Sequence, residues 1–159
     1  MVMKLYLCLL FPGDEVLIDI IKSKIHTDIL FSNLSDPACG AIVTFEGRVR
    51  NHNDGKKIIN LHYECYESMA LKVMNEIKEE ALKKWDVKKI IAIHRIGNIP
   101  IGETAVWIGV LSVHRKEAFS ACEFMINEIK HKVPIWKKET YEDGSTSWVD
   151  CCEVVSSTK

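Results

Sequence analysis

Two arginines, Arg48 and Arg50, stand two residues apart in the stretch GRVRN. Side chains two residues apart on a strand point to the same face, so both guanidinium groups should lie on one side and Val49 on the other. Guanidinium groups bind phosphate and carboxylate through charge-assisted hydrogen bonds. The first chemistry that the sequence suggests is therefore anion binding at the end of a strand.

A histidine and an arginine, His114 and Arg115, stand where an apolar stretch passes into a helical pattern. The first turn of a helix has free backbone N–H groups and the positive end of the helix dipole, and both favour an anion. The pair therefore predicts a second anion-binding position. His114 is also a weaker candidate for proton transfer.

The third basic segment is KHKVPIWKKE. Lys130 lies in the last turn of the expected helix, and the proline that follows prevents the helix from continuing. On the strand expected next, Lys137 and Glu139 share one face and Lys138 lies on the other. Lys130 and Lys137 are the candidate catalytic residues, as general acids or bases, because cationic neighbours favour proton loss from an ammonium group.

Each basic segment alone has an ordinary explanation, because charged side chains at the ends of strands and helices are mostly exposed. Together they suggest one shared site. If Arg50, Arg115, Lys130 and Lys137 lie within about 6 Å of one another, each pair repels by about 3 kcal/mol at an effective dielectric of about 20. The hypothesis is that a phosphate-bearing ligand offsets this repulsion.

A nucleophile of the protein itself is missing from these segments. They contain no cysteine, and the chain has no G-x-S-x-G, H-E-x-x-H, P-loop or G-x-G-x-x-G sequence. These patterns would indicate a serine nucleophile, a zinc site or a glycine-rich phosphate loop. The predicted chemistry therefore uses cations and proton transfer, with the nucleophile supplied by another molecule.

The overall composition limits the function classes. The chain has 159 residues and a net charge of −1, with 47% apolar and 27% charged residues. A nucleic-acid-binding module is usually basic overall or along one stripe, so that class is disfavoured. The size predicts a single catalytic domain over residues 1–150, with room for a small hairpin-rich sublobe, followed by a frayed tail over residues 151–159.

Cysteine spacing and the N-terminus predict the compartment. Six cysteines occur without a C-x-x-C pair, which predicts free thiols in a reduced, cytoplasmic protein that binds no metal. The apolar stretch MVMKLYLCLLF runs into a proline-glycine turn and is too short to span a bilayer. It predicts a first strand rather than a membrane anchor or an export signal.

Helical periodicity predicts the helices that position these segments. A short N-terminal helix is expected over residues 14–26, and two longer helices over residues 67–85 and 115–132. The inward residues of the first should be Val16, Ile20, Ile21 and Ile25. Those of the last should be Ala118, Cys122, Met125 and Ile129.

Apolar runs predict the strands. Residues 39–66 are expected to form a hairpin that turns at Asp54-Gly55. The run ETAVWIGVLSVH is apolar on both faces and predicts a central strand, and IWKKETY should pair with STSWVD. Hairpins interleaved with helices predict an α+β fold, a mixed and largely antiparallel sheet packed against two long helices and one shorter N-terminal helix.

Read together, several of these stretches resemble the large, catalytic subunit of molybdopterin synthase. The resemblance runs in order from about Gly40 to Trp148 and rests on GAIVTFEGRVRNHNDGKK, LHYECYESMA, IHRIGNIPIGE, SVHRKEAFSAC and KHKVPIWKKE. It implies a sulfurtransferase of molybdenum cofactor biosynthesis that uses no cofactor. Such an enzyme converts cyclic pyranopterin monophosphate into molybdopterin by adding the two dithiolene sulfurs.

The resemblance also implies partners. The sulfur arrives as a thiocarboxylate at the C-terminus of a small ubiquitin-like subunit, which would supply the missing nucleophile. A homodimer of large subunits with one small subunit at each end forms a heterotetramer, without nucleic acid or membrane. The alternative is a non-catalytic scaffold that binds the sulfur-carrier protein through a sheet edge.

The residues that the resemblance implies fall on the three basic segments. Arg50, His114 and Arg115 would hold phosphate and pterin, with Lys130 and Lys137 nearest the chemistry, and the division of roles between the two lysines is left open. The full substrate-binding set is Arg48, Val49, Arg50, His114, Arg115, Lys130, Lys137, Lys138 and Glu139.

Overall fold

The computed structural model describes residues 16–149, which form two sheets. The first sheet has four strands in the order β1 (Val16–Ile21), β5 (Val87–Arg95), β7 (Thr104–Ser112) and β2 (Ala41–Arg48). β1 runs parallel to β5, and the other neighbours are antiparallel. The mixed sheet of the expected α+β fold is therefore confirmed.

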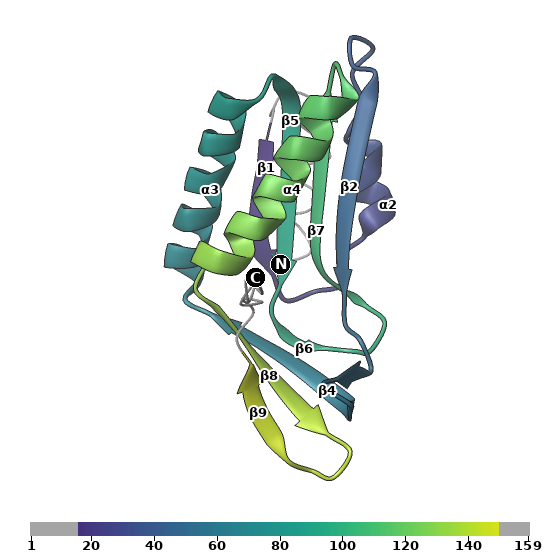
Figure 1. Ribbon diagram of the computed structural model, residues 1–159, viewed down its shortest axis with the longest axis vertical. Coiled ribbons are helices and arrows are strands. Elements are labelled where there is room, and N and C mark those ends of the chain that lie inside the picture. The colour runs from purple at the N-terminus through teal and green to yellow at the C-terminus, as the bar shows by residue number, and fades with distance from the viewer. Residues whose placement is uncertain (1–15, 150–159) are drawn as a thin grey trace, which may run out of the picture.

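The described helices are α2 (Thr27–Ser32), α3 (Glu67–Lys84) and α4 (Arg115–Lys132). α3 and α4 lie next to each other across one face of the first sheet, and α2 lies on the other side (Figure 1). The predicted boundaries of both long helices are confirmed to within a residue. The four residues predicted to face inward on α4 are all buried.

Strand β7 lies at the centre of the first sheet, as its apolar sequence predicts. All of its residues are buried. Val106 and Ile108 pack with the core between the sheet and the two long helices, whereas Trp107 and Leu111 pack with Leu30 of α2 on the opposite face. Both faces are covered, which explains why the run is apolar without alternation.

The second sheet lies beyond the C-terminal end of α4 (Figure 1). It contains β3 (His52–Asn53), β4 (Lys56–Cys65), β8 (Ile135–Tyr141) and β9 (Thr146–Val149), in that order. A further strand, β6 (Gly97–Ile99), also pairs with β4. The predicted hairpin between β8 and β9 is confirmed.

The predicted helix over residues 14–26 is wrong from residue 16 onward. Residues 16–21 form β1, which pairs in parallel with β5 from Val16↔Ile90 to Ile21↔Arg95. Branched side chains at Ile18, Ile20 and Ile21 favour a strand, and burial against a neighbouring strand outweighs the helical spacing. The first strand expected over residues 1–11 and the tail over residues 151–159 lie outside the described residues.

The predicted hairpin over residues 39–66 is also wrong. β2 pairs with β7 in the first sheet, while β4 pairs with β8 in the second. The chain leaves the first sheet at a register irregularity between Gly47 and Arg48. The Asp54-Gly55 turn does form, with positive φ at both residues, but it joins β4 to the short strand β3.

The three cysteines within residues 16–149, Cys39, Cys65 and Cys122, are free thiols. In the same part of the chain, no helix is long and apolar enough to cross a membrane. No group of three or more histidine, cysteine, aspartate or glutamate residues there is placed to hold a metal ion.

Candidate functional site

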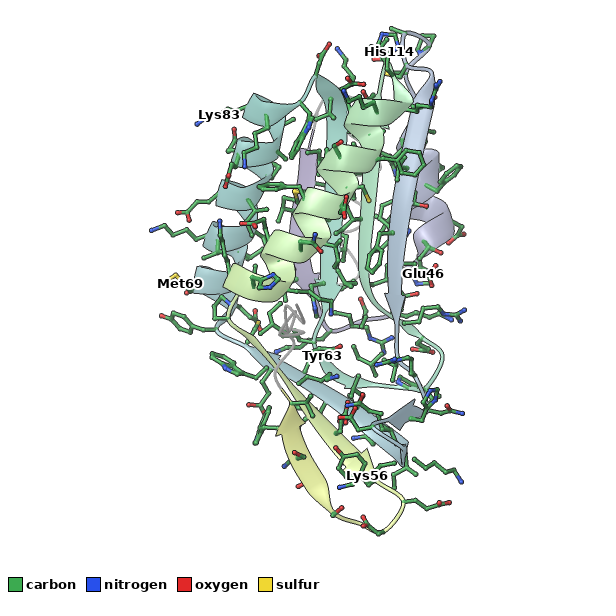
Figure 2. All side chains as sticks on the ribbon, in the orientation of Figure 1. Glu46, Lys56, Tyr63, Met69, Lys83 and His114 are labelled. Atoms are coloured by element: carbon green, nitrogen blue, oxygen red, sulfur yellow. The ribbon has the colours of Figure 1, made fainter. Side chains whose placement is uncertain are left out.

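The C-terminal end of α4 meets the second sheet at a small cavity. The cavity measures about 10 Å³, which is about enough for one water molecule. Its polar side chains are His94 of β5 and Lys130 of α4, and its apolar lining is Val106, Ile126, Ile129, Val133 and Ile135. Figure 2 shows Tyr63 of β4 at this junction, between the end of α4 and the second sheet.

A buried carboxylate holds one of the two predicted catalytic lysines. Glu139 is 1% exposed, and its Oε1 lies 3.0 Å from the Nζ of Lys137. Its Oε2 accepts hydrogen bonds from the hydroxyl of Tyr141 at 2.9 Å and from Nδ2 of Asn53 at 3.2 Å. Burial raises the pKa of Glu139, but the hydrogen bonds from Lys137, Tyr141 and Asn53 outweigh it and lower the pKa. The charged carboxylate therefore fixes the ammonium group of Lys137.

The predicted positions of Lys137 and Lys138 on β8 are confirmed. Lys137 and Glu139 share one face and contact each other. Lys138 points to the opposite face, where its Nζ lies 5.7 Å from the ring centroid of Trp148 on β9. Within one copy of the chain, Lys138 therefore lies on the face of β8 opposite Lys137, and its place in the substrate-binding set stays a prediction.

Lys130 and Lys137 are linked through two aromatic side chains. Lys137 is the register partner of Tyr63 on β4. The ring of Tyr63 contacts the ring of His94 edge-on, with 5.2 Å between centroids. His94 in turn lines the cavity beside Lys130. The two lysines therefore lie in one contiguous region at the junction of the two sheets.

His94 is a buried histidine, only 7% exposed. Its Nδ1 lies 2.9 Å from the carbonyl oxygen of Arg95, and because a carbonyl only accepts, Nδ1 must carry the hydrogen. Burial lowers the pKa of His94 to about 4; the hydrogen bond to Arg95 opposes this shift and the charge of Lys130 adds to it. The imidazole is therefore neutral at physiological pH.

Acid should destabilise the protein through His94. An unfolded histidine takes up a proton near pH 6.5, but the folded one does so only near pH 4, so the unfolded state binds more protons in between. Stability should therefore fall as the pH drops through this window, by roughly 3 kcal/mol for this residue. Urea unfolding at pH 7 and pH 4.5 should show a smaller loss in His94→Gln than in the parent. Equal losses in the two proteins would contradict the assignment.

The Arg48–Arg50 segment reaches the same junction through Val49. Val49 is 3% exposed and packs in one cluster with Tyr63. Its N–H donates to the carbonyl oxygen of Glu103 at 3.0 Å, and its carbonyl accepts from the N–H of Gly102 at 2.8 Å. The strand ends at Arg48, but burial still alternates, with both arginines exposed on either side of Val49.

His114 and Arg115 lie at the other end of the molecule. They start α4, whereas Lys130 is in its last turn, and Figure 2 shows His114 at the end farthest from Tyr63. Arg115 and Lys130 are fifteen positions apart in the helix, which is about 22 Å at the rise of an α-helix. The hypothesis that these cations converge within about 6 Å is therefore wrong for a single copy of the chain.

Sequence reasoning missed the side chains that support the two lysines. Tyr141 could have been found, because it follows Glu139 by two residues and so shares its face. His94 had a weaker signal, a histidine within an otherwise apolar strand. Asn53 had none, because it reaches Glu139 from a separate hairpin, 86 residues away along the chain.

Comparison with known proteins gives consistent matches. The family model described as "MoaE protein" matches residues 20–132. The molybdopterin synthase catalytic subunit of Arabidopsis thaliana is 43% identical over 133 residues, covering 82% of this chain and 67% of the relative. That of Bacillus subtilis is 44% identical over 131 residues, covering 82% and 83%. The crystal structure of molybdopterin synthase from Staphylococcus aureus superposes with a TM-score of 0.77 at 39% identity, covering 82% and 95%.

Proposed function

The chain belongs to the MoaE family of molybdopterin synthase catalytic subunits, and on that basis we propose that it adds sulfur to cyclic pyranopterin monophosphate. Enzymes of this family act in molybdenum cofactor biosynthesis, in a step that transfers sulfur. The proposed product is molybdopterin, with its two dithiolene sulfurs. The proposed compartment is the cytoplasm, since free cysteines are typical of a reducing environment.

The proposed sulfur donor is a small ubiquitin-like subunit with a C-terminal thiocarboxylate. The relatives are named catalytic subunits, a name that itself implies another subunit. A thiocarboxylate from outside also fits the basic segments, which contain no cysteine. Its sulfur would form a new carbon–sulfur bond at a side-chain carbon of the pterin, while the bond from that carbon to an oxygen substituent breaks and the oxygen leaves with its electron pair and takes up a proton. Water would then attack the carbonyl carbon, releasing the donor as a carboxylate and leaving the sulfur on the product.

The observation that carries this proposal is the Lys137–Glu139 pair beside the Lys130 cavity. Attack at the donor carbonyl places negative charge on its oxygen, and a fixed ammonium group stabilises that charge most when it needs no reorientation. Lys137 is fixed by a carboxylate that is itself buried and hydrogen-bonded. Lys130 stands close by, so either lysine can serve an oxyanion or transfer a proton.

The proposed substrate contacts come from two copies of the chain. Val49 packs in the cluster that contains Tyr63, with the exposed Arg48 and Arg50 on either side of it in the chain, and Arg50 is proposed to hold the phosphate. His114 and Arg115 lie at the far end of α4, so they can contact the same ligand only from a second copy. The proposed homodimer within a heterotetramer would supply that copy.

Reconstitution tests the proposed function directly. The chain is mixed with the thiocarboxylated small subunit and cyclic pyranopterin monophosphate, and the pterin is analysed by mass spectrometry. Two sulfur atoms should be added per pterin, with the carrier returned as its carboxylate. A scaffold would bind the carrier and leave the pterin unchanged, and this result would reject the enzymatic proposal.

A further inference from the structure

His94 and Lys130 are the polar side chains of one cavity, but they come from different elements. His94 is near the end of β5, opposite Val106 of β7, and Lys130 is in the last turn of α4. The rest of the cavity is lined by apolar side chains of α4, β7 and β8 and by Val133, which follows α4. A polar pair in such a setting gains strength from the low local dielectric.

The orientation of the His94 ring is fixed on two sides. Nδ1 donates to the carbonyl oxygen of Arg95, and the ring packs against the ring of Tyr63 in a T-shaped arrangement. In the neutral imidazole, a hydrogen on Nδ1 leaves Nε2 as a lone-pair acceptor. A lysine ammonium has only donors, so His94 and Lys130 are complementary. Tyr63 on β4 is the titratable side chain in ring contact with His94, and Lys130 is the charged neighbour that acts on it.

The two predicted catalytic lysines therefore have different supports. Lys137 contacts a carboxylate, which cancels part of its positive charge. His94 can orient an ammonium group without adding negative charge, since it remains neutral. A hydrogen bond from Lys130 to His94 would therefore not in itself weaken the attraction of the ammonium group for a phosphate or an oxyanion.

We infer that His94 is a positioning residue for Lys130, with Nε2 accepting a hydrogen bond from the ammonium group directly or through the one water molecule that the cavity can hold. This inference rests on the proposed function, because it assumes that Lys130 takes part in sulfur transfer. It assigns a role to a buried histidine that makes no contact with the reacting atoms.

A double-mutant cycle tests the inference. His94→Phe keeps a ring of similar size and removes the acceptor, and His94→Gln keeps an acceptor. In the reconstituted complex, His94→Phe should slow single-turnover product formation by about 10- to 100-fold, as expected when a reacting group is misplaced. His94→Gln should recover most of this loss.

The decisive comparison uses a Lys130→Ala background. If His94 acts through Lys130, His94→Phe should cause no further loss there, because the two changes remove the same interaction. Full additivity of the two effects would overturn the inference. If Lys130→Ala is as active as the parent, the proposed role of Lys130 fails instead, and the two failures are thus distinguishable.

A second measurement does not depend on activity or on the stability of His94→Phe. In protein with ¹⁵N-labelled histidine, NMR should show the His94 Nδ1–H form, and Lys130→Met should shift the Nε2 resonance. The matched control is Lys72→Met, an exposed lysine on α3 that pairs with Glu76. An Nε2 resonance that is the same in the parent and both variants would also overturn the inference.

Discussion

Replacement of Lys137 with alanine is expected to lower sulfur transfer by about 100- to 1,000-fold, the usual effect of removing one fixed donor to an oxyanion. Binding of the small subunit should be unchanged, because the change removes one lysine side chain that is only 17% exposed. Single-turnover product formation and titration with the carrier measure the two quantities separately. Product formation at the parent rate would remove Lys137 from the mechanism.

Lys137→Ala also has a structural consequence that must be separated from catalysis. It leaves the buried carboxylate of Glu139 with only Tyr141 and Asn53 of its three partners, which should cost about 1–3 kcal/mol of stability. The double variant Lys137→Ala/Glu139→Gln removes the buried charge and should recover part of that stability. Its activity should stay as low as that of Lys137→Ala, since no cation returns.

Lys137→Arg distinguishes between two roles of the lysine. Arginine keeps the positive charge and can pair with Glu139, but it does not lose a proton at accessible pH. Activity within about 10-fold of the parent would indicate electrostatic stabilisation alone. A loss as large as that of Lys137→Ala would indicate proton transfer. Lys72→Ala, on the exposed face of α3, serves as the matched control and should leave the rate unchanged.

Local sequence patterns predict correctly which residues share a face, where buried residues repeat at the spacing of one helix or one strand. The α4 stripe and the alternation of Lys137, Lys138 and Glu139 on β8 were predicted correctly, because each depends on the geometry of one helix or one strand. β7 was predicted as central because a strand covered on both faces has no polar side.

Pairing between distant segments could not be predicted in the same way. The turn at Asp54-Gly55 lies between β2 and β4 in the sequence and favours a hairpin of these two strands locally. The turn instead joins β3 to β4, and β2 pairs with β7, more than 50 residues further along the chain. Residues 16–21, five of which are apolar, have the spacing of a helix, and their strand partner β5 is also distant along the chain, so the sequence alone favours the wrong element. The stability of pairing between distant strands depends on their neighbours in the assembled sheet, so it cannot be read from the residues of one short segment.

The separation of Arg115 from Lys130 could have been derived from the sequence. Both were assigned to one helix, and the rise of that helix alone places them about 22 Å apart. The resemblance to the synthase family implies that both residues belong to one active site. If so, their distance within one chain requires that two copies of the chain contribute to each site. The wrong expectation that these cations converge within one chain thus leads to a prediction that the active protein is at least a dimer.

Two inactive variants should restore activity to each other. If each site takes Lys137 from one copy and Arg115 from the other, a heterodimer of Lys137→Ala and Arg115→Ala chains has one site with both changes and one intact site. Random assortment of equal amounts gives half heterodimers, so about a quarter of all sites should be intact. Product formation should rise from near background in either variant to about a quarter of the parent rate after subunit exchange, with native mass spectrometry confirming the heterodimer.

The control for this experiment mixes two variants whose substituted residues belong to the same copy of the chain within each site. Lys130 and Lys137 lie in one region of a single chain, so a heterodimer of Lys130→Ala and Lys137→Ala chains has one change in each site and no intact site. No recovery is expected from that mixture. Recovery in the control, or none in the mixture of Lys137→Ala and Arg115→Ala, would show that His114 and Arg115 do not complete the site of a second copy. The test is specific because the two mixtures differ only in which end of α4 carries the second substitution.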